Sequence, residues 1–430
     1  MKSGSDGNCN GAGACGSTAN VAAGKFCSGG SEVVGLCDSN WHCSGTNNCQ
    51  YVCNGAGSCS QNYNCDSCTD CSCSCGRANE VILNYNCADG IDNDCDGFTD
   101  SADTGCFKWA PLGTGLGSEP KCFVVWNNNL YVGGDFVQAS GVAVNHIARW
   151  DGSSWYPVGG GLTGTYGAYA CTIWNNNLYA GGYFTKAGSV SANRIARWDG
   201  SSWSALGSGM DAQVYALAVW NNALYAGGWF TTAGGVSANN IAKWSGSSWS
   251  ALGSGMNAQV YALAEWNGAL YAGGLFSTAS GVTVNRIAKW DGTSWTPLGS
   301  GMNGIVYSLV VYNGNLYAGG AFTTAGGVSA SRIARWDGAS WSAVGSGIGG
   351  EVRSLAVGNS ALYAGGTFTN AGSVSANNIV KWDGATYSAL YTGTNNAVYC
   401  VTVWNNKVYA GGYFTSAGGV SGTTKIAKYG

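Results

Sequence analysis

An acidic segment near residue 100 has the ligand spacing of a calcium loop. The sequence DNDCDGFTDSAD occupies residues 92–103. In a twelve-residue calcium loop, side-chain oxygens at positions 1, 3, 5, 9 and 12 and a backbone carbonyl at position 7 surround the ion. Those positions are filled here by Asp92, Asp94, Asp96, Asp100, Asp103 and, at position 7, Phe98. We therefore expect Ca²⁺ at this segment, and the alternative is a solvated acidic linker.

Cysteine is the second residue type that could do chemistry. The chain holds 19 Cys, of which 13 precede residue 76, including CDSCTDCSCSC at 65–75. Such a cluster could bind zinc or an iron–sulfur centre, but only His42 lies nearby in the sequence. A cysteine density this high is typical of disulfides made in an oxidising compartment, so we expect an extracellular or cell-surface protein. Because the first residues contain no apolar segment, we expect its secretion leader to be missing from this sequence.

Three cysteines lie outside this region. Cys122 and Cys400 each stand four residues before a tryptophan, Trp126 and Trp404, so they occupy equivalent positions in two repeats. Cys171 is offset by one residue and is expected on the other side of its strand. The sequence therefore predicts a Cys122–Cys400 disulfide and an unpaired Cys171.

Residues for catalysis are sparse. Residues 107–430 contain one histidine, His146, which leaves no Ser-His-Asp or Cys-His pair and is too few for a copper oxidase site with two histidines. Glycoside hydrolysis needs two carboxylates about 5–10 Å apart, and Glu119, Glu265 and Glu351 are isolated in sequence. We predict that the protein is not an enzyme.

Most of the chain consists of a repeated unit, which must position the candidate residues of this region. The pattern L-Y-x-G-G-x-F begins at Leu130, Leu178, Leu224, Leu270, Leu316, Leu362 and, with valine first, at Val408, at spacings of 48, 46, 46, 46, 46 and 46 residues. One unit contains four short apolar runs, at 214–220, 223–230, 241–244 and 249–255, separated by polar turns. A period in the mid-forties with four strands per unit predicts an all-β fold, a seven-bladed β-propeller.

The two ends of the repeat region complement each other. The last unit stops at residues 425–430, after its third strand, and FKWAPLGTGL at 107–116 matches the missing fourth strand. This predicts a ring closed by an N-terminal strand. The domains expected are a Cys-rich disulfide-stapled arm at 1–86, a Cys-bracketed calcium loop at 87–106 and the propeller at 107–430.

On these motifs, residues 107–430 resemble a family of secreted bacterial repeat proteins with L-Y-x-G-G-x-F and I-A-x-W-D-G signatures, similar to propellers of the kelch and cell-polarity-marker type. The segment CADGIDNDCDGFTD resembles disulfide-bracketed, EF-hand-like metal-binding motifs of bacterial surface proteins. The first resemblance implies the fold and leaves the activity open, because propellers carry many functions.

Regularly repeated polar residues favour structural roles. Asp151, Asp199, Asp291, Asp337 and Asp383 stand between a tryptophan and a glycine, where an aspartate fixes a tight turn by binding its own backbone. Ser245 takes this place in one unit. The basic residue two places earlier is expected to pack its stem on the sheet. Trp229 differs from its counterparts and is a candidate for stacking on a sugar.

Composition narrows the function classes. With 19 basic and 22 acidic residues the net charge is −3, which argues against a nucleic-acid binder, and no apolar run is long enough for a membrane span. Two hypotheses remain. The first is a non-catalytic extracellular structural or adhesive protein that assembles with copies of itself, as a filament or surface layer, through the Cys-rich arm. The second is a propeller module that binds carbohydrate or another surface polymer.

Overall fold

A computed structural model of the chain describes residues 25–28, 31–34, 51–53, 59–61 and 108–430. It divides into two compact units, Met1–Phe107 and Lys108–Gly430. In the first unit, β1 (Lys25–Ser28) pairs with β2 (Ser31–Val34), and β3 (Tyr51–Cys53) pairs with β4 (Cys59–Gln61). The described residues form strands and turns and no helix.

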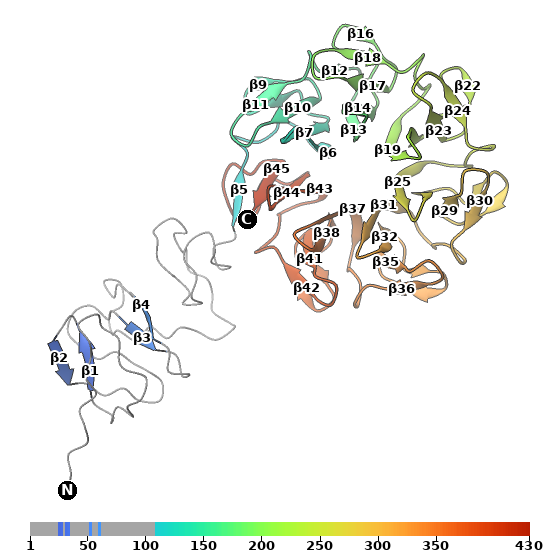
Figure 1. The fold of residues 1–430 in the computed structure, drawn as a ribbon. Coiled ribbons are helices and arrows are strands. Elements are labelled where there is room, and N and C mark those ends of the chain that lie inside the picture. Colours follow the sequence, from blue (N-terminus) through green and yellow to red (C-terminus); the bar gives the residue numbers. More distant parts are fainter. Residues whose placement is uncertain (1–24, 29–30, 35–50, 54–58, 62–107) are drawn as a thin grey trace. The chain divides into compact units, whose positions relative to one another are not determined.

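The second unit contains seven four-stranded antiparallel sheets, or blades, arranged around a common centre as in a β-propeller (Figure 1). From the centre outward their strands are β6 (Pro120–Trp126), β7 (Asn129–Gly134), β10 (Ile147–Trp150) and β11 (Trp155–Pro157) in blade 1; β13 (Ala168–Trp174), β14 (Asn177–Gly182), β17 (Ile195–Trp198) and β18 (Trp203–Ala205) in blade 2; β19 (Val214–Trp220), β20 (Ala223–Gly228), β23 (Ile241–Trp244) and β24 (Trp249–Ala251) in blade 3; β25 (Val260–Trp266), β26 (Ala269–Gly274), β29 (Ile287–Trp290) and β30 (Trp295–Pro297) in blade 4; β31 (Val306–Tyr312), β32 (Asn315–Gly320), β35 (Ile333–Trp336) and β36 (Trp341–Ala343) in blade 5; β37 (Glu351–Gly358), β38 (Ala361–Thr367), β41 (Ile379–Trp382) and β42 (Tyr387–Ala389) in blade 6; and β43 (Val398–Trp404), β44 (Lys407–Gly412), β45 (Ile426–Tyr429) and β5 (Trp109–Pro111) in blade 7. The predicted repeat of four-stranded antiparallel sheets is confirmed.

The second and third strands of most blades are joined through a small hairpin of two-residue strands. These hairpins are β8 (Gln138–Ala139) with β9 (Val142–Ala143), β15 (Lys186–Ala187) with β16 (Val190–Ser191), β21 (Thr232–Ala233) with β22 (Val236–Ser237), β27 (Thr278–Ala279) with β28 (Val282–Thr283), β33 (Thr324–Ala325) with β34 (Val328–Ser329), and β39 (Asn370–Ala371) with β40 (Val374–Ser375). In blade 2 the hairpin also pairs with β12 (Leu162–Thr163).

Local sequence explains the inner hairpin of each blade. In blade 3 the two-residue turn Asn221-Asn222 has φ of 45° and 52°, a left-handed conformation that asparagine tolerates and that suits the twist of a hairpin. The register of the two inner strands then shifts between Val214 and Ala216, so the strand bulges at Tyr215. The same shift occurs in all seven inner strands.

The Gly-Gly pair at the end of the second strand allows the blades to approach closely. A Cβ at Gly227 would collide with Val260 of the next blade, and one at Gly228 would collide with the carbonyl oxygen of Gln213. The first glycine is therefore required by blade-to-blade packing and the second by the close approach of the bulged inner strand.

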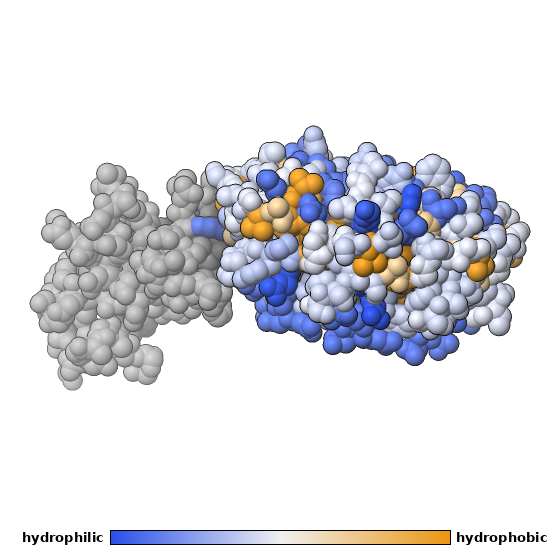
Figure 2. All heavy atoms as spheres, turned by 90° about the horizontal axis from the view of Figure 1, so that it is seen from above, coloured by the Kyte–Doolittle hydropathy of each residue, from blue (hydrophilic) through white to orange (hydrophobic). Residues whose placement is uncertain are grey.

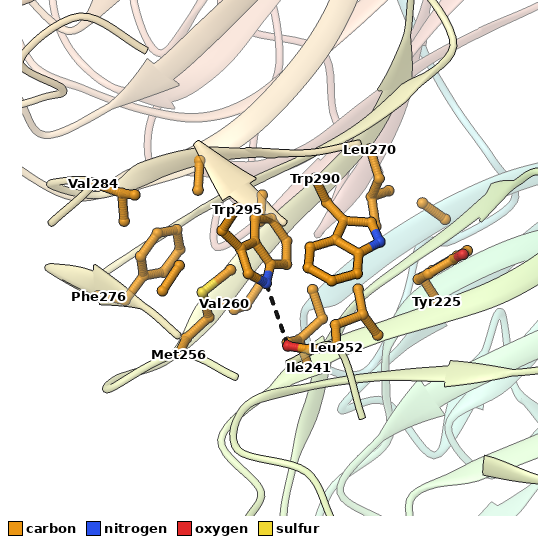
Figure 3. Packing of buried hydrophobic residues seen from close by; sticks show 14 of the residues in the cluster. Tyr225, Ile241, Leu252, Met256, Val260, Leu270, Phe276, Val284, Trp290 and Trp295 are labelled. Atoms are coloured by element: carbon orange, nitrogen blue, oxygen red, sulfur yellow. Dashed lines mark hydrogen bonds between the residues drawn. The ribbon is translucent and has the colours of Figure 1, made fainter. Parts of the chain in front are cut away.

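A tryptophan of the outer strand ties each blade to the one before it. The Trp295 indole N–H donates to the Leu252 carbonyl over 3.3 Å, and the centroids of the Trp290 and Trp295 rings are 5.1 Å apart (Figure 3). The corresponding ring pairs in blades 1 and 2 are 5.0 and 5.3 Å apart. Equivalent bonds run from Trp109, Trp155, Trp203, Trp249 and Trp341 to the carbonyls of Leu390, Leu112, Val158, Leu206 and Leu298, and from the Tyr387 hydroxyl to Val344. The recurrent tryptophans of the repeat therefore pack blade against blade.

Blade 7 is made from both ends of the repeat region. Strand β5 pairs with β45 in the register Trp109 to Tyr429, Lys428 to Ala110 and Ala427 to Pro111. Trp109 is 2% exposed and lies 5.3 Å from the Tyr429 ring. Across the next seam the Trp404 indole N–H donates to Asn128 Oδ1 over 3.4 Å.

The predicted Cys122–Cys400 disulfide is wrong. Cys122 of blade 1 is bonded to Cys171 of blade 2, and Cys400 is a buried free thiol. Successive side chains of a regular strand point to opposite faces, so equivalent positions outside the bulge, such as those of Cys122 and Cys400, face the same way around the ring and do not face each other. Both sulfurs of the observed pair lie beside Gly133, whereas Cys400 lies beside Gly411 together with Phe123.

The observed disulfide has a clear consequence for stability. It spans 49 residues, for which the chain-entropy model gives roughly 4 kcal/mol of stabilisation. It joins blades 1 and 2, so the seam between blades 7 and 1 is held by packing and hydrogen bonds.

Trp109 offers a direct test of how much strand β5 contributes to blade 7 and to its seam with blade 6. We expect Trp109→Ala to lower the free energy of unfolding by about 3–5 kcal/mol, because it removes a buried aromatic ring and its hydrogen bond. The conservative Trp109→Phe keeps most of the apolar area. It should lower the free energy of unfolding by only about 1 kcal/mol, because it loses the hydrogen bond and leaves a small cavity. Urea denaturation of both variants measures this. A loss below about 1 kcal/mol for the alanine variant would mean that this strand contributes little.

Candidate functional site

The two faces of the propeller differ in what they carry. One, here called the loop face, is formed by the segments between second and third strands, such as 275–286, and by the crossings between blades, such as 299–305. The other, the turn face, carries the two-residue turns after the inner strands and the turns after the third strands. On the loop face, Asn257 Oδ1 accepts the backbone N–H groups of Ser277 and Thr278, which ties the crossing to the longer segment.

A collar of aromatic and basic side chains surrounds the centre at the loop-face end. Its members are the bulged residues of the seven inner strands: Lys121, Tyr169, Tyr215, Tyr261, Tyr307, Arg353 and Tyr399. The inner strands lie nearest the centre of the ring (Figure 1). A bulge redirects a side chain, and here it does so once per blade.

Neighbouring members of the collar touch across the blade seams. The ring centroids are 5.9 Å apart for Tyr169 and Tyr215, and 5.3 Å apart for Tyr215 and Tyr261. Tyr307 follows at 5.7 Å from Tyr261, and the Arg353 guanidinium lies 4.2 Å from the Tyr307 ring. These contacts make a continuous arc over blades 2 to 6.

On the other side of the collar, the Lys121 ammonium lies 4.4 Å from the Tyr399 ring. The collar is therefore a surface of half-buried aromatic rings with a cation at two places. Such rings combine an apolar body with a polar tip, a combination common in binding sites.

Burial shifts the pKa of four of the collar tyrosines. It raises the pKa of Tyr215, Tyr261 and Tyr307 above the ordinary value for a phenol. The pKa of Tyr169 is also raised, first by burial and then by the nearby Asp135 carboxylate. At neutral pH these hydroxyls remain protonated, so each of them can both donate and accept a hydrogen bond.

Further aromatic side chains are exposed on the loop face. Trp229 and Tyr413, at the x of G-G-x-F, are 56% and 51% exposed, and Tyr166 in the crossing to blade 2 is 47% exposed. Tyr166 stacks on Tyr183 at 6.0 Å, and the Arg194 guanidinium lies 5.3 Å from the Tyr183 ring. Figure 2, a view onto the rim of the propeller, shows apolar residues there as separate patches.

Acidic residues near the collar are engaged by cations. Asp135 pairs with Lys121 at 3.6 Å, Glu119 pairs with Lys425 at 3.2 Å, and Glu351 pairs with Arg353. Burial lowers the pKa of His146, whose Nδ1 has no hydrogen-bond partner. Within residues 108–430 no three His, Cys, Asp or Glu side chains are grouped as a metal site.

The calcium-loop residues Asp92, Asp94, Asp96, Phe98, Asp100 and Asp103 lie outside the described residues. So do the cysteines of residues 1–106 as far as their side chains are concerned. The calcium prediction and the boundary between residues 86 and 87 stay predictions.

The turn interpretation of the repeated aspartates is confirmed. Asp151 Oδ1 accepts the backbone N–H groups of Ser153 and Ser154, each at 2.8 Å. These bonds hold the pKa of the exposed Asp151 carboxyl well below its usual range. Ser245 makes longer bonds, of 3.4 and 3.2 Å, to Ser247 and Ser248.

The basic residues of the third strands also have a local role. In blade 1 the Arg149 guanidinium lies 4.3 Å from the Tyr156 ring of the outer strand. In blade 5, Arg335 Nε donates to Ser342 Oγ over 3.2 Å. Neither contact is part of the loop face.

The sequence interpretation missed the collar. Its signal is a tyrosine that recurs at the start of the inner strand, in AYA, VYA, VYA, VYS and VYC. In a regular strand this tyrosine would point to one face of the sheet, in alternation with its neighbours. The bulge, which the sequence does not reveal, redirects its side chain.

The comparisons with known proteins concern the fold. No family model and no curated protein matches the chain. The WD40 β-propeller domain of Doa1 has a TM-score of 0.51 and 14% identity over 75% of this chain and 97% of its own. The extracellular domain of BT4673 from B. thetaiotaomicron, described as a one component system, has a TM-score of 0.50 and 14% identity.

That second match covers 75% of this chain but 39% of the other, so this protein spans well under half of its length. At 14% identity both neighbours show a β-propeller architecture and no function. One neighbour is an extracellular domain, and the described residues hold one disulfide. No helix among the described residues is long and apolar enough to cross a membrane.

Ser245 allows a test of the turn role. We expect Ser245→Asp to raise the melting temperature at neutral pH, because a carboxylate accepts the two N–H bonds more strongly than a hydroxyl. The folded-state pKa of such an aspartate is lowered, so its stabilisation is present above the ordinary pKa and is lost as the pH falls below about 4.

Melting curves at several pH values, with Asp199→Ser as the reverse change in the preceding blade, measure the effect. A gain that persists unchanged at pH 2 would show that the carboxylate charge is not its cause.

Proposed function

We propose that this is a non-catalytic extracellular adhesive protein whose propeller binds carbohydrate or another surface polymer on its loop face. Of the two functions that the sequence leaves open, this combines the adhesive role of the first with the ligand of the second. The observation that carries it is the concentration of exposed and half-buried aromatic rings on the loop face, from the collar outward to Trp229 and Tyr413.

Rigidity of the support favours binding. The collar residues stand on β-strands, and the loops beyond them are fixed by side-chain bonds such as those of Asn257 and Asp211. A surface that is already ordered loses little conformational entropy when a ligand arrives. Flat tyrosine and tryptophan rings offer apolar contact to sugar rings, and their polar tips offer hydrogen bonds to hydroxyl groups.

For the residues before the propeller, the proposal is argued from the sequence alone. The Cys-rich arm joins copies of the protein into a filament or surface layer, and the calcium loop that follows it binds Ca²⁺ at Asp92, Asp94, Asp96, Phe98, Asp100 and Asp103. A segment with 13 Cys and few large apolar residues has little core of its own, so a docking surface would stabilise it. Strand β5 (Trp109–Pro111) supplies the outer strand of blade 7. The cysteine density favours an extracellular place for the protein.

The ligand surface can be tested with two aromatic substitutions. We expect Trp229→Ala and Tyr413→Ala each to weaken binding of the best ligand from a glycan array by about three- to tenfold, since each removes a stacking surface. Tyr156→Ala, which removes a 38%-exposed aromatic ring from an outer strand, is the matched control and should bind as the unchanged protein does. Failure of the array to find any glycan would contradict the proposal.

Calcium and assembly form a separate test. Calorimetry should show Ca²⁺ binding to the full chain that Asp94→Ala weakens, because it removes a ligand from the predicted loop. Sedimentation and electron microscopy should show larger assemblies when calcium is added. A full-length protein that stays monomeric at high concentration with calcium would rule out self-assembly, and equal calcium heats for both proteins would rule out the site.

A further inference from the structure

Three arginines gather on one sector of the loop face. In blades 4 and 5 the loop-face segments carry Arg286 and Arg332, and in blade 6 strand β37 carries the collar residue Arg353, which pairs with the one carboxylate of this sector, Glu351. Within the described residues the side chains of Arg286 and Arg332 have no ion pair and no hydrogen bond, and Arg286 Nε is buried without a partner. The sector therefore has a net positive charge beside the aromatic collar.

The backbone at these two arginines is unusual for their type. Arg286 and Arg332 have φ of 71° and 65°, in the left-handed region that glycine and asparagine adopt more readily. The equivalent residues are Asn240 and Asn378 in blades 3 and 6, with φ of 63° and 64°, and His146, Arg194 and Lys425 in blades 1, 2 and 7, with φ of 70°, 64° and 65°. Arginine stands here although asparagine suits this backbone better.

Asparagine at this place also makes a bond that arginine does not. Asn240 Nδ2 donates to the Met256 carbonyl and Asn378 Nδ2 to the Thr394 carbonyl, each at 2.8 Å. Arg286 and Arg332 make only backbone bonds, among them those from their N–H groups to Phe276 and Phe322. Neither the turn nor the sheet needs an arginine side chain, and strained residues of this kind cluster at functional sites.

The distance to the collar suits a shared ligand. In blade 5, Val306 pairs with Gly320, and Gly319 pairs with Ile333, so Tyr307 and Arg332 stand at the same end of three adjacent strands. Two strand spacings separate their backbones by about 10 Å. An arginine side chain and a tyrosine ring extended over that gap can contact neighbouring residues of one polymer.

We propose that this sector binds an acidic polysaccharide, with sugar rings against Tyr261 and Tyr307 and sugar carboxylates on Arg286 and Arg332. The proposal rests on the proposed function and specifies its ligand. Arginine matches a carboxylate with two parallel hydrogen bonds, which a neutral sugar cannot accept in the same way. Single-stranded nucleic acid also uses stacking and arginine, but it needs a basic groove along every phosphate, and three arginines against one carboxylate over three blades fall short of that.

The test compares matched polymers and matched variants of the full-length protein. Calorimetry would measure binding of polygalacturonate and hyaluronate, with methyl-esterified polygalacturonate as the neutral match, in buffer without added calcium because calcium gels the first polymer. The variant is Arg286→Asn with Arg332→Asn, which places in blades 4 and 5 the residue found in blades 3 and 6. The control, Arg149→Gln with Arg335→Gln, removes the same charge from third strands.

We expect the unchanged protein to bind an acidic polymer and not the ester. The asparagine variant should bind at least tenfold more weakly, because it loses two charge-assisted contacts, while its melting temperature stays equal or rises. The control variant should bind within twofold of the unchanged protein.

Other outcomes separate the two proposals. Equal binding of the ester, or full binding by the asparagine variant, would overturn the acidic-ligand proposal and leave carbohydrate binding in place. Binding of no polysaccharide, here or on the glycan array, would overturn both. Tighter binding of oligothymidylate than of any polysaccharide, lost in the same variant, would replace carbohydrate with nucleic acid.

Discussion

The hydrogen bond from an outer-strand aromatic side chain to the preceding blade is the contact on which the ring depends. A four-stranded sheet of this size cannot bury both of its faces alone, so every blade needs two neighbours. The bond recurs at all seven seams, six times from tryptophan and once from Tyr387. At one seam it comes from Trp109, at the other end of the propeller sequence from its sheet partner Tyr429.

The same seams fix which side chains can meet. Each blade turns one sheet face to the blade before it and the other to the blade after it, so outside the bulge a contact between the facing inner strands joins positions of opposite parity. Ser308 and Ser354, at the position of Cys122, accept the backbone N–H groups of Leu355 and Val401 in the following blades. This rule explains the Cys122–Cys171 disulfide and places Cys400 against Phe123, the residue at the position of Cys171.

The sequence predicted what depends on local pattern and repetition. The strand runs, the Asn-Asn turns and the Asp151 type of turn follow from residue type and spacing, and all are present. The disulfide was mispredicted because the parity of a contact depends on how whole blades face one another. The collar was not predicted because the bulge at Tyr215 and its equivalents arises from pairing with the Gly-Gly strand, and nothing local in VYA marks it.

These constraints act differently on the seam positions and on the loop-face positions of each repeat. Seam residues are nearly invariant between blades because the same geometry recurs at each of them, whereas the loop-face positions hold Trp229, Leu275 and Ala321 at one site and Asn240, Arg286 and Arg332 at another. Asparagine satisfies the left-handed backbone and a neighbouring carbonyl, so arginine there is a local loss of stability. A scaffold held at seven seams tolerates such losses, and it is at these tolerant positions that the blades differ in charge and aromatic character.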